Sequence, residues 1–313
     1  MLIAVCILIF GSLLWSHEDS SFYTPGEMES AGGGGAGAVV LSALLPGAGQ
    51  LYSSQYVKGG IILAFEVVTA AVAHNWLAKS NVRRKSYQEL IDSVHYYGAK
   101  GSDGALDEDE LEVYRDRAVR FSIRADQADF SVREARYRAY SAFAWMAGGY
   151  VYSLSDALGH SGLIDIEGPR DPALAAGLAA IPGLGLGQFY NGEFSKGGLV
   201  IMVQGSLAVV ALNYHRLMQE ASRNYGIMSH TQSEQHRFAN EYGRYWKGKY
   251  DSAFSNRNTY LWYSLFFYLY SVVDAVVDAH LFDFPEKTRI LPDLAVGNSG
   301  LGFSYSFYFG TND

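Results

Sequence analysis

Apolar residues in this 313-residue chain gather in blocks that are long enough to cross a bilayer as helices, and stretches dense in charge separate the blocks. The blocks lie at residues 59–76, 140–158, 197–214 and 260–281, and shorter apolar runs lie at 36–45 and 173–181. This pattern is typical of a membrane protein with sizeable polar insertions. It predicts an all-α integral membrane fold.

The chain begins with a shorter apolar run at residues 2–15, which has the length of a signal-peptide core. We therefore predict a signal peptide at 1–16, and an uncleaved short anchor is the alternative. Residues 17–35 are polar and then rich in glycine, which predicts a flexible lead-in.

The last part of the chain changes its period. Apolar and small side chains alternate from Leu301 to Phe309, which is the period of a β-strand. The sequence Gly-Asn-Ser-Gly at 297–300 is a turn signal. A short C-terminal β-hairpin is therefore predicted within residues 286–310.

Two stretches of the chain contain the same motifs in the same order. PGAGQLY at 46–52 recurs as PGLGLGQFY at 182–190, and Lys-Gly-Gly follows each copy at the same distance. The Tyr-x-Tyr-Ser segment that begins at Tyr150 and ends in Asp-Ala recurs from Tyr268. Recurrence of unlike motifs in a fixed order indicates a duplicated unit.

The predicted repeats divide the chain into two membrane units. The first is 36–164 with a polar insertion at 79–139, and the second is 173–282 with an insertion at 215–258. In the first insertion Asp107 and Glu110 have the spacing of a helix N-terminal capping pair. Acidic and basic residues four apart then predict a long helix. These pairs are Asp116–Arg120, Asp129–Arg133 and Glu134–Arg138.

Each PGxGQ motif predicts a sharp bend, because proline removes a backbone donor and glycine tolerates tight turns. Lipid leaves unpaired backbone groups without water, so a bend at membrane depth needs a polar group nearby, and Gln50 and Gln188 are the candidates. The alternative is an ordinary helix-turn-helix loop in water. The bend residues are Pro46, Gly47, Gly49, Gln50, Tyr52, Pro182, Gly183, Gly187, Gln188 and Tyr190.

A bend followed by two spans makes a three-helix unit, for which two topologies remain open. If the helix before each bend crosses the membrane, the odd number of spans inverts the second unit, and the two insertions face opposite sides. If that helix is re-entrant, both insertions share a side. The inverted arrangement is favoured, with the mildly basic second insertion on the cytoplasmic side.

Glu66 lies roughly 12 Å along its predicted span, close to the middle of the hydrocarbon layer. A carboxylate at that depth is costly, so it is a functional hypothesis by default. In the second unit its position is held by Gln204. The two side chains either hydrogen-bond across the bundle as structural contacts, or Glu66 takes part in conduction or substrate binding.

Asp156 and Asp274 lie near the C-terminal ends of their predicted helices, where the helix dipole disfavours negative charge. Because each insertion sends the chain out and back, these ends return to the level of Lys58 and Lys196. We therefore predict two equivalent ion pairs, Lys58–Asp156 and Lys196–Asp274, with a structural role.

Composition narrows the possible functions. The net charge of −8, without a basic run, argues against a nucleic-acid partner. The one cysteine, Cys6, lies in the first apolar run, so disulfides play no part in the rest of the chain. Asp156 with His160 has the spacing of two ligands on one helical face, but Gly159 interrupts that helix. No metalloprotease, paired-cysteine or Ser/His/Asp pattern is present. We expect no catalytic residue, metal or cofactor.

The segments PGAGQLYSSQYVKGG and PGLGLGQFYNGEFSKGG resemble a bacterial membrane-domain family of unknown function marked by PGxGQxYNGxxxKG. The motif is also similar to that of two-transmembrane hairpin domains. The second copy matches through Asn191, Gly192 and Lys196, whereas the first has Ser53 and Ser54 in place of Asn-Gly. The resemblance implies an integral membrane protein of the bacterial envelope, and it implies no activity.

These observations predict a non-enzymatic protein of the bacterial inner (cytoplasmic) membrane, exported through a signal sequence. Its expected partners are the lipid bilayer and an unknown protein that it scaffolds or docks through its helical insertions. The alternative is a small transporter or channel built from the duplicated bundle around Glu66. A weaker third hypothesis is a membrane-embedded enzyme that acts on lipid.

Overall fold

The computed structural model describes most of the chain, including the first predicted repeat and most of the second. The described residues are 35–164, 166, 168–230, 236–282, 290–297 and 300–307. The predicted signal peptide, and the predicted lead-in apart from its last residue, lie outside them.

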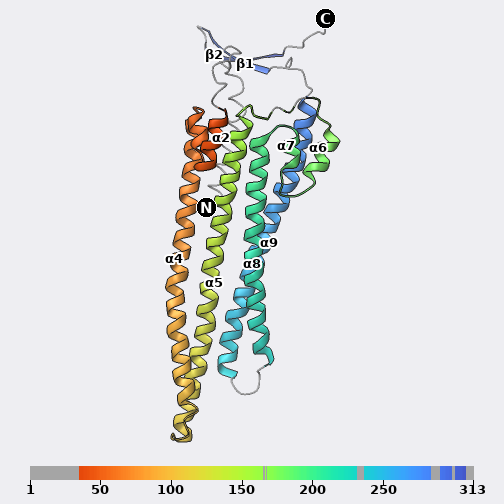
Figure 1. Ribbon diagram of the computed structural model, residues 1–313. Helices are drawn as coiled ribbons and strands as arrows, with labels where there is room; N and C mark the ends of the chain where they lie inside the picture. The colour runs from red at the N-terminus through yellow and green to blue at the C-terminus, as the bar shows by residue number, and fades with distance from the viewer. Residues whose placement is uncertain are drawn as a thin grey trace.

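Four long helices make up most of the described part. They are α4 (Tyr56–Lys100), α5 (Glu108–Gly159), α8 (Phe194–His230) and α9 (His236–Phe282). They follow one another in a row, with α4 packed on α5, α5 on α8 and α8 on α9 (Figure 1). With 52 residues, α5 is about 78 Å long. The long helices therefore extend well beyond the thickness of a bilayer.

Four short helices lie together at one end of this row. The pair α2 (Gly35–Leu44) and α3 (Ala48–Tyr52) precedes α4, and the pair α6 (Pro172–Ala179) and α7 (Leu186–Tyr190) precedes α8. In Figure 1 both pairs lie at the upper end, α2 against α5 and α6 against α9. Each pair is joined by a predicted PGxGQ bend.

The lengths of α2 and α6 contradict the inverted topology that the sequence favours. The ten residues of α2 span about 15 Å and the eight of α6 about 12 Å, against a hydrocarbon layer of about 30 Å. Neither can cross a membrane, so the interpretation with three crossings per unit is wrong. The last turns of α4 and α8 and the first turns of α5 and α9 all lie at the lower end (Figure 1). The two insertions therefore point in the same direction.

The polar insertions are continuous with the apolar helices. The sequence places boundaries at residues 79 and 139, but α4 and α5 run through both positions without a break. Polarity changes at both positions, but neither proline nor glycine is present to end a helix, since both are absent from residues 61–97 and 105–147. The predicted cap is present, with the Asp107 carboxylate accepting from the Glu110 backbone N–H at 2.8 Å.

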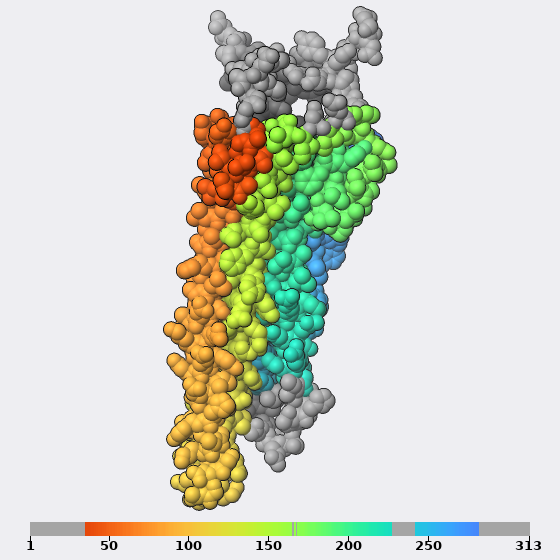
Figure 2. Space-filling view, in the orientation of Figure 1, coloured from red at the N-terminus to blue at the C-terminus, as the bar shows by residue number. Residues whose placement is uncertain are grey.

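Each long helix thus has an apolar half and a charged half. The apolar half of the molecule comprises residues 56–78, 139–159, 194–214 and 259–282. The stalk comprises residues 79–100, 108–138, 215–230 and 236–258. Figure 2 shows the lower end of the α4–α5 hairpin, in orange to yellow, projecting beyond the coloured part of α8.

In the described part, three helices are long and apolar enough to cross a membrane, judged by length and composition: α4, α8 and α9. The apolar segment of α5, which the sequence predicts as a further span, is not among them because its tyrosines and serines lower its hydropathy. Only 11% of the most apolar window of α9 is buried, against 61% for α8. Large apolar side chains such as Trp262 and Phe266 are therefore exposed on the surface of α9.

Two separate cores hold the helices together. In the apolar half, a cluster centred on α8 at Leu199, Met202, Val203 and Leu207 packs against large side chains from the other three long helices. The added side chains are Phe65, Trp145, Tyr152, Tyr260 and Phe267. In the stalk, a fully buried Trp246 packs edge-on against Phe130, with 5.2 Å between ring centroids.

The only strands in the described part lie near the C-terminus. Strand β1 (Ile290–Gly297) pairs antiparallel with β2 (Gly300–Phe307), with Ile290 opposite Phe307. This two-stranded sheet occupies the segment whose alternation predicts a hairpin. Every other element of the described part is a helix.

Candidate functional site

Both bends are made by a glycine with left-handed backbone geometry. Gly47 has φ of 86° and precedes α3, and Gly185 has φ of 61° and precedes α7. A Cβ at Gly47 would lie 2.6 Å from the Gly59 carbonyl oxygen, and one at Gly185 would lie 2.5 Å from that of Gly197. Each bend therefore packs directly on the Lys-Gly-Gly segment that follows it.

The structural counterpart of Gly47 is Gly185 rather than the predicted Gly183. The sequence singles out Gly183, which also has a positive φ of 84°. An added Cβ at Gly183 would approach nothing closer than the Gln204 Cβ at 3.8 Å. The close contact belongs to Gly185, because the two extra residues of PGLGLGQ fall before the turn that opens α7.

The remaining bend residues position the short helices. Pro46 and Pro182 lie in the connections that lead into the two turns. Gly49 is buried where α3 meets α2, and a Cβ there would lie 2.2 Å from the Ala38 carbonyl oxygen. Gly187 packs in the same way against α6, and a Cβ there would lie 2.6 Å from the Ala179 methyl group. The tyrosines that end α3 and α7 are Tyr52 and Tyr190.

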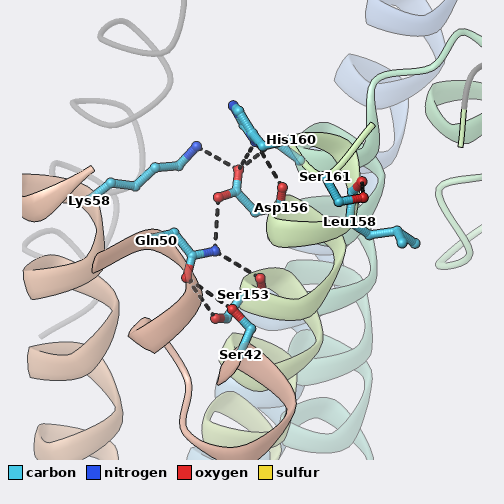
Figure 3. Close-up of polar contacts among 9 residues, drawn as sticks. Ser42, Gln50, Lys58, Ser153, Asp156, Leu158, His160 and Ser161 are labelled. Atoms are coloured by element: carbon cyan, nitrogen blue, oxygen red, sulfur yellow. Dashed lines mark hydrogen bonds and ion pairs between the residues drawn. The ribbon is translucent and has the colours of Figure 1, made fainter. Parts of the chain in front are cut away.

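Gln50 links the first bend to α5. Its side-chain amide donates to the Ser153 carbonyl oxygen at 2.9 Å and to the Asp156 carboxylate at 3.0 Å. Its oxygen accepts from the hydroxyls of Ser42 and Ser153, both at 3.3 Å. Figure 3 shows Gln50 placed between these groups. The side chain is 2% exposed, so the polar group that the bend requires is present and fully used.

Asp156 is the centre of the first site. Its side chain is 0% exposed, and its Oδ1 atom lies 2.5 Å from the Lys58 Nζ atom. The predicted contact between these residues is therefore present in the structure, with Lys58 reaching across from α4 (Figure 3). The Ser195 hydroxyl also donates to Oδ1, and the His160 Nδ1 atom lies 3.8 Å from it.

The second site has the same kinds of contact as the first, but its net charge differs. Gln188 donates to the Ser271 carbonyl oxygen at 2.7 Å, as Gln50 does to that of Ser153. The Lys196 Nζ atom lies 3.6 Å from Asp274 but only 2.7 Å from Asp278. The predicted Lys196–Asp274 contact is therefore the longer of two, and Asp278 is the nearer partner.

The two sites differ at one position of the recurring sequence pattern. Asp278 follows Asp274 by one helical turn, as His160 follows Asp156. The first site thus combines one lysine with one buried aspartate and a histidine, whereas the second combines one lysine with two aspartates. Within the described residues no group of three or more His, Cys, Asp or Glu side chains could hold a metal ion.

The structure does not pair Glu66 with Gln204. Gln204 exchanges hydrogen bonds with Ser264, donating to its carbonyl oxygen at 3.0 Å and accepting from its hydroxyl at 2.8 Å. The Glu66 Oε1 atom is buried beside Gly149, where an added Cβ would lie 2.5 Å away, and it has no hydrogen-bond partner in the described part. The expectation of a Glu66–Gln204 contact across the bundle is wrong.

The site around Asp156 is suited to holding helices together. Its carboxylate collects donors from α3, α4 and the start of α8, so one buried group joins three elements. Removing one partner of a buried pair leaves an uncompensated charge, at a cost of about 3–5 kcal/mol. Ser195 could not be found from the repeat pattern, because its contact depends on how the two units pack.

The comparisons with known proteins reach the second half of the chain. Residues 168–305 match a family of unknown function, DUF5683. The match covers the second bend, α8, α9, β1 and most of β2, and it leaves residues 35–164 outside. It is consistent with the uncharacterised family that the motif resembles. No match was found among curated proteins or among solved structures.

Proposed function

We propose that this chain is an integral membrane protein of the bacterial envelope that docks or scaffolds a protein partner through its stalk. The observation that carries the proposal is the continuity of α4 and α5. Both helices pass from an apolar half into a charged half without interruption, and their connected end projects beyond the coloured part of α8 (Figure 2). A rigid helical hairpin fixed at one end in lipid presents its other end at a constant distance from the membrane.

The proposal includes duplication of one unit. In each half of the chain a short apolar helix, a bend at a left-handed glycine, a five-residue helix and two long helices follow in the same order. The hydrogen bonds of Gln50 and Gln188 to α5 and α9 support the same relation. In this arrangement α2 and α6 are re-entrant, and each unit crosses the membrane twice.

The distribution of basic residues orients the protein. Many lysines and arginines lie on the stalk side of the apolar half, within about 20 residues of the spans, where the positive-inside rule applies. They include Lys79, Arg83, Arg84, Lys85, Arg133, Arg136, Arg138, Arg216, Arg223 and Arg257. At the opposite end the described basic residues are Lys58, Arg170 and Lys196. We propose that the stalk is cytoplasmic, that the bends face the periplasmic side of the inner membrane, and that the N-terminal signal sequence directs export.

The docking role is tested with a photo-crosslinking amino acid at two positions on α4. Tyr96 is 57% exposed near the end of the stalk, and Val68 is 55% exposed in the apolar half, so the pair is matched for helix and exposure. We expect irradiation of intact cells to join the Tyr96 variant to one protein of defined mass, and the Val68 variant to lipid. Docking by the stalk would be contradicted if the Tyr96 variant gave no protein adduct, or if the two variants gave protein adducts in equal amounts.

The transporter hypothesis rests on the unpaired, buried oxygen of Glu66. Its test is ion or solute flux into liposomes that contain the purified chain, compared with the Glu66→Gln variant. If the protein only docks a partner, neither the wild type nor the variant gives flux above that of empty liposomes. Flux that the wild type supports and the variant abolishes would replace the docking proposal with transport.

A further inference from the structure

A cavity of about 390 Å³ lies on one side of the row of helices and takes its lining from all four of them. Because the long helices contact one another in the order α4, α5, α8 and α9, a shared cavity requires the row to curve around it. The outer helices α4 and α9 contribute Trp76 and Tyr260. The central helices contribute Arg138 on α5 and Tyr214 on α8.

The cavity lies at the level where the apolar half meets the stalk. Trp76 is three residues before Lys79, the first charge of the stalk, and Tyr214 ends the apolar run of α8. Tyr260 begins the apolar run of α9, and its ring stacks on that of Tyr214 with 5.6 Å between centroids. Tryptophan and tyrosine concentrate at the depth of lipid headgroups, because their rings are apolar and their tips are polar.

The charge beside the cavity is positive. The Arg138 guanidinium lies 4.6 Å from the centre of the Trp76 ring and donates to Glu134 at 2.7 Å. Glu134 also accepts from Lys249 at 3.1 Å, so two cations share one carboxylate. Lys79 adds a third cation, 4.5 Å from the centre of the Trp76 ring.

Glu134 does not remove this excess positive charge. Burial alone would raise the pKa of Glu134, but Lys249 and Arg138 together hold it below its ordinary value. The carboxylate therefore stays ionised at neutral pH and neutralises only one of the two cations that it binds. One helical turn further into the stalk, Glu220 is paired with Arg133 at 2.9 Å, so that carboxylate is also engaged.

We propose that this cavity binds the headgroup phosphate of an anionic phospholipid from the cytoplasmic leaflet. Arg138 supplies the phosphate contact, since its planar fork matches phosphate oxygens and its pairing with Glu134 uses one of its five N–H groups. Trp76, Tyr214 and Tyr260 form the walls around the headgroup. Basic pockets between transmembrane helices on the cytoplasmic side are suited to such headgroups. The inference rests on the proposed membrane location and orientation.

The test is native mass spectrometry of the full chain, purified in detergent, delipidated and then incubated with equal amounts of phosphatidylglycerol and phosphatidylcholine. Both lipids carry the phosphate, but only phosphatidylcholine carries a quaternary ammonium, which the Arg138 guanidinium repels. We therefore expect one phosphatidylglycerol to bind with about tenfold preference. Arg138→Gln is expected to remove that preference. Arg136→Gln, two residues away on α5 and outside the cavity lining, is expected to keep it.

Three results would overturn the assignment. These are equal binding of the two lipids by the wild type, an unchanged preference in Arg138→Gln, and displacement of the lipid by an equal concentration of glycerol phosphate, which would assign the site to a soluble phosphate ester. If Arg138→Gln does not fold, two measurements still test the assignment. One is the lipid preference of the wild type, and the other is lipid binding by Arg138→Lys, which keeps the cation and is expected to retain binding. A wild-type chain that stays in the aqueous fraction without detergent would instead refute the membrane proposal itself.

Discussion

Replacement of Asp156 by alanine is expected to destabilise the folded chain by about 3–5 kcal/mol, the usual cost of breaking a buried ion pair. The substitution leaves the Lys58 ammonium without its carboxylate 2.5 Å away, and it removes the acceptor of Gln50 and Ser195. The loss would release α3, α4 and the start of α8 from α5 at one point. Unfolding in mixed detergent micelles, followed by tryptophan fluorescence, measures the change in free energy.

The second unit offers a matched control for this prediction. Asp274→Ala removes the corresponding carboxylate, but Lys196 keeps Asp278 at 2.7 Å. We therefore expect a loss of about 1 kcal/mol or less, typical of a partly solvated pair. Equal destabilisation by Asp156→Ala and Asp274→Ala would show that burial and the extra partner do not distinguish the two sites.

Gly59→Ala is expected to cost about 2–3 kcal/mol, because it adds a methyl group where two segments already touch. A Cβ at Gly59 would lie 2.8 Å from the Gly47 carbonyl oxygen and 2.8 Å from the Leu51 side chain. The first contact is with backbone, which cannot turn aside as a flexible side chain can. Relief requires α4 to move away from the bend. The same unfolding measurement applies.

The adjacent glycine gives the opposite expectation. Gly60 is exposed within α4, and an added Cβ would meet nothing within 4 Å. Gly60→Ala is expected to stabilise the chain by about 0.5–1 kcal/mol, because alanine loses less backbone freedom than glycine in a helix. If Gly60→Ala proves as harmful as Gly59→Ala, the close packing of the bend on α4 is not the reason that this segment contains glycine.

The contact between Lys58 and Asp156 could be predicted from the sequence by a physical argument. An aspartate near a helix C-terminus needs compensation, and a chain that goes out and back returns to its starting level. Both premises depend only on helix length and charge, which the sequence contains. The same holds for Gln50, since a bend among apolar residues requires a polar partner.

Other features of the site depend on three-dimensional packing that the sequence pattern does not specify. Alignment of the repeats pointed to Asp274 as the partner of Lys196, but Asp278 one turn later points to the same side of α9 and lies closer. Ser195 reaches Asp156 from the other unit, so its role follows from the contact between α5 and α8. Gly185 was missed because the two-residue extension obscured which glycine makes the turn.

The three-crossing interpretation is wrong because the apolar runs before the two bends form helices that are too short to be spans. Residues 36–45 and 173–181 are as apolar as the long apolar segments. The lengths of α2 and α6, however, are only about half the thickness of the hydrocarbon layer or less. Continuity of α4 into the stalk was hidden for a different reason. Hydropathy marks where the surroundings of a helix change, and backbone signals such as proline mark where a helix ends.

In the proposed arrangement both helical hairpins project from the membrane on the same, cytoplasmic side. Single cysteines at Gly104, Ser222 and Leu163, in a chain whose native Cys6 is changed to serine, test it in spheroplasts with a thiol reagent that cannot cross the membrane. We predict labelling at position 163 in intact spheroplasts, and labelling at 104 and 222 only after lysis. Labelling of 104 and 222 from opposite sides, or of all three from outside, would contradict the account.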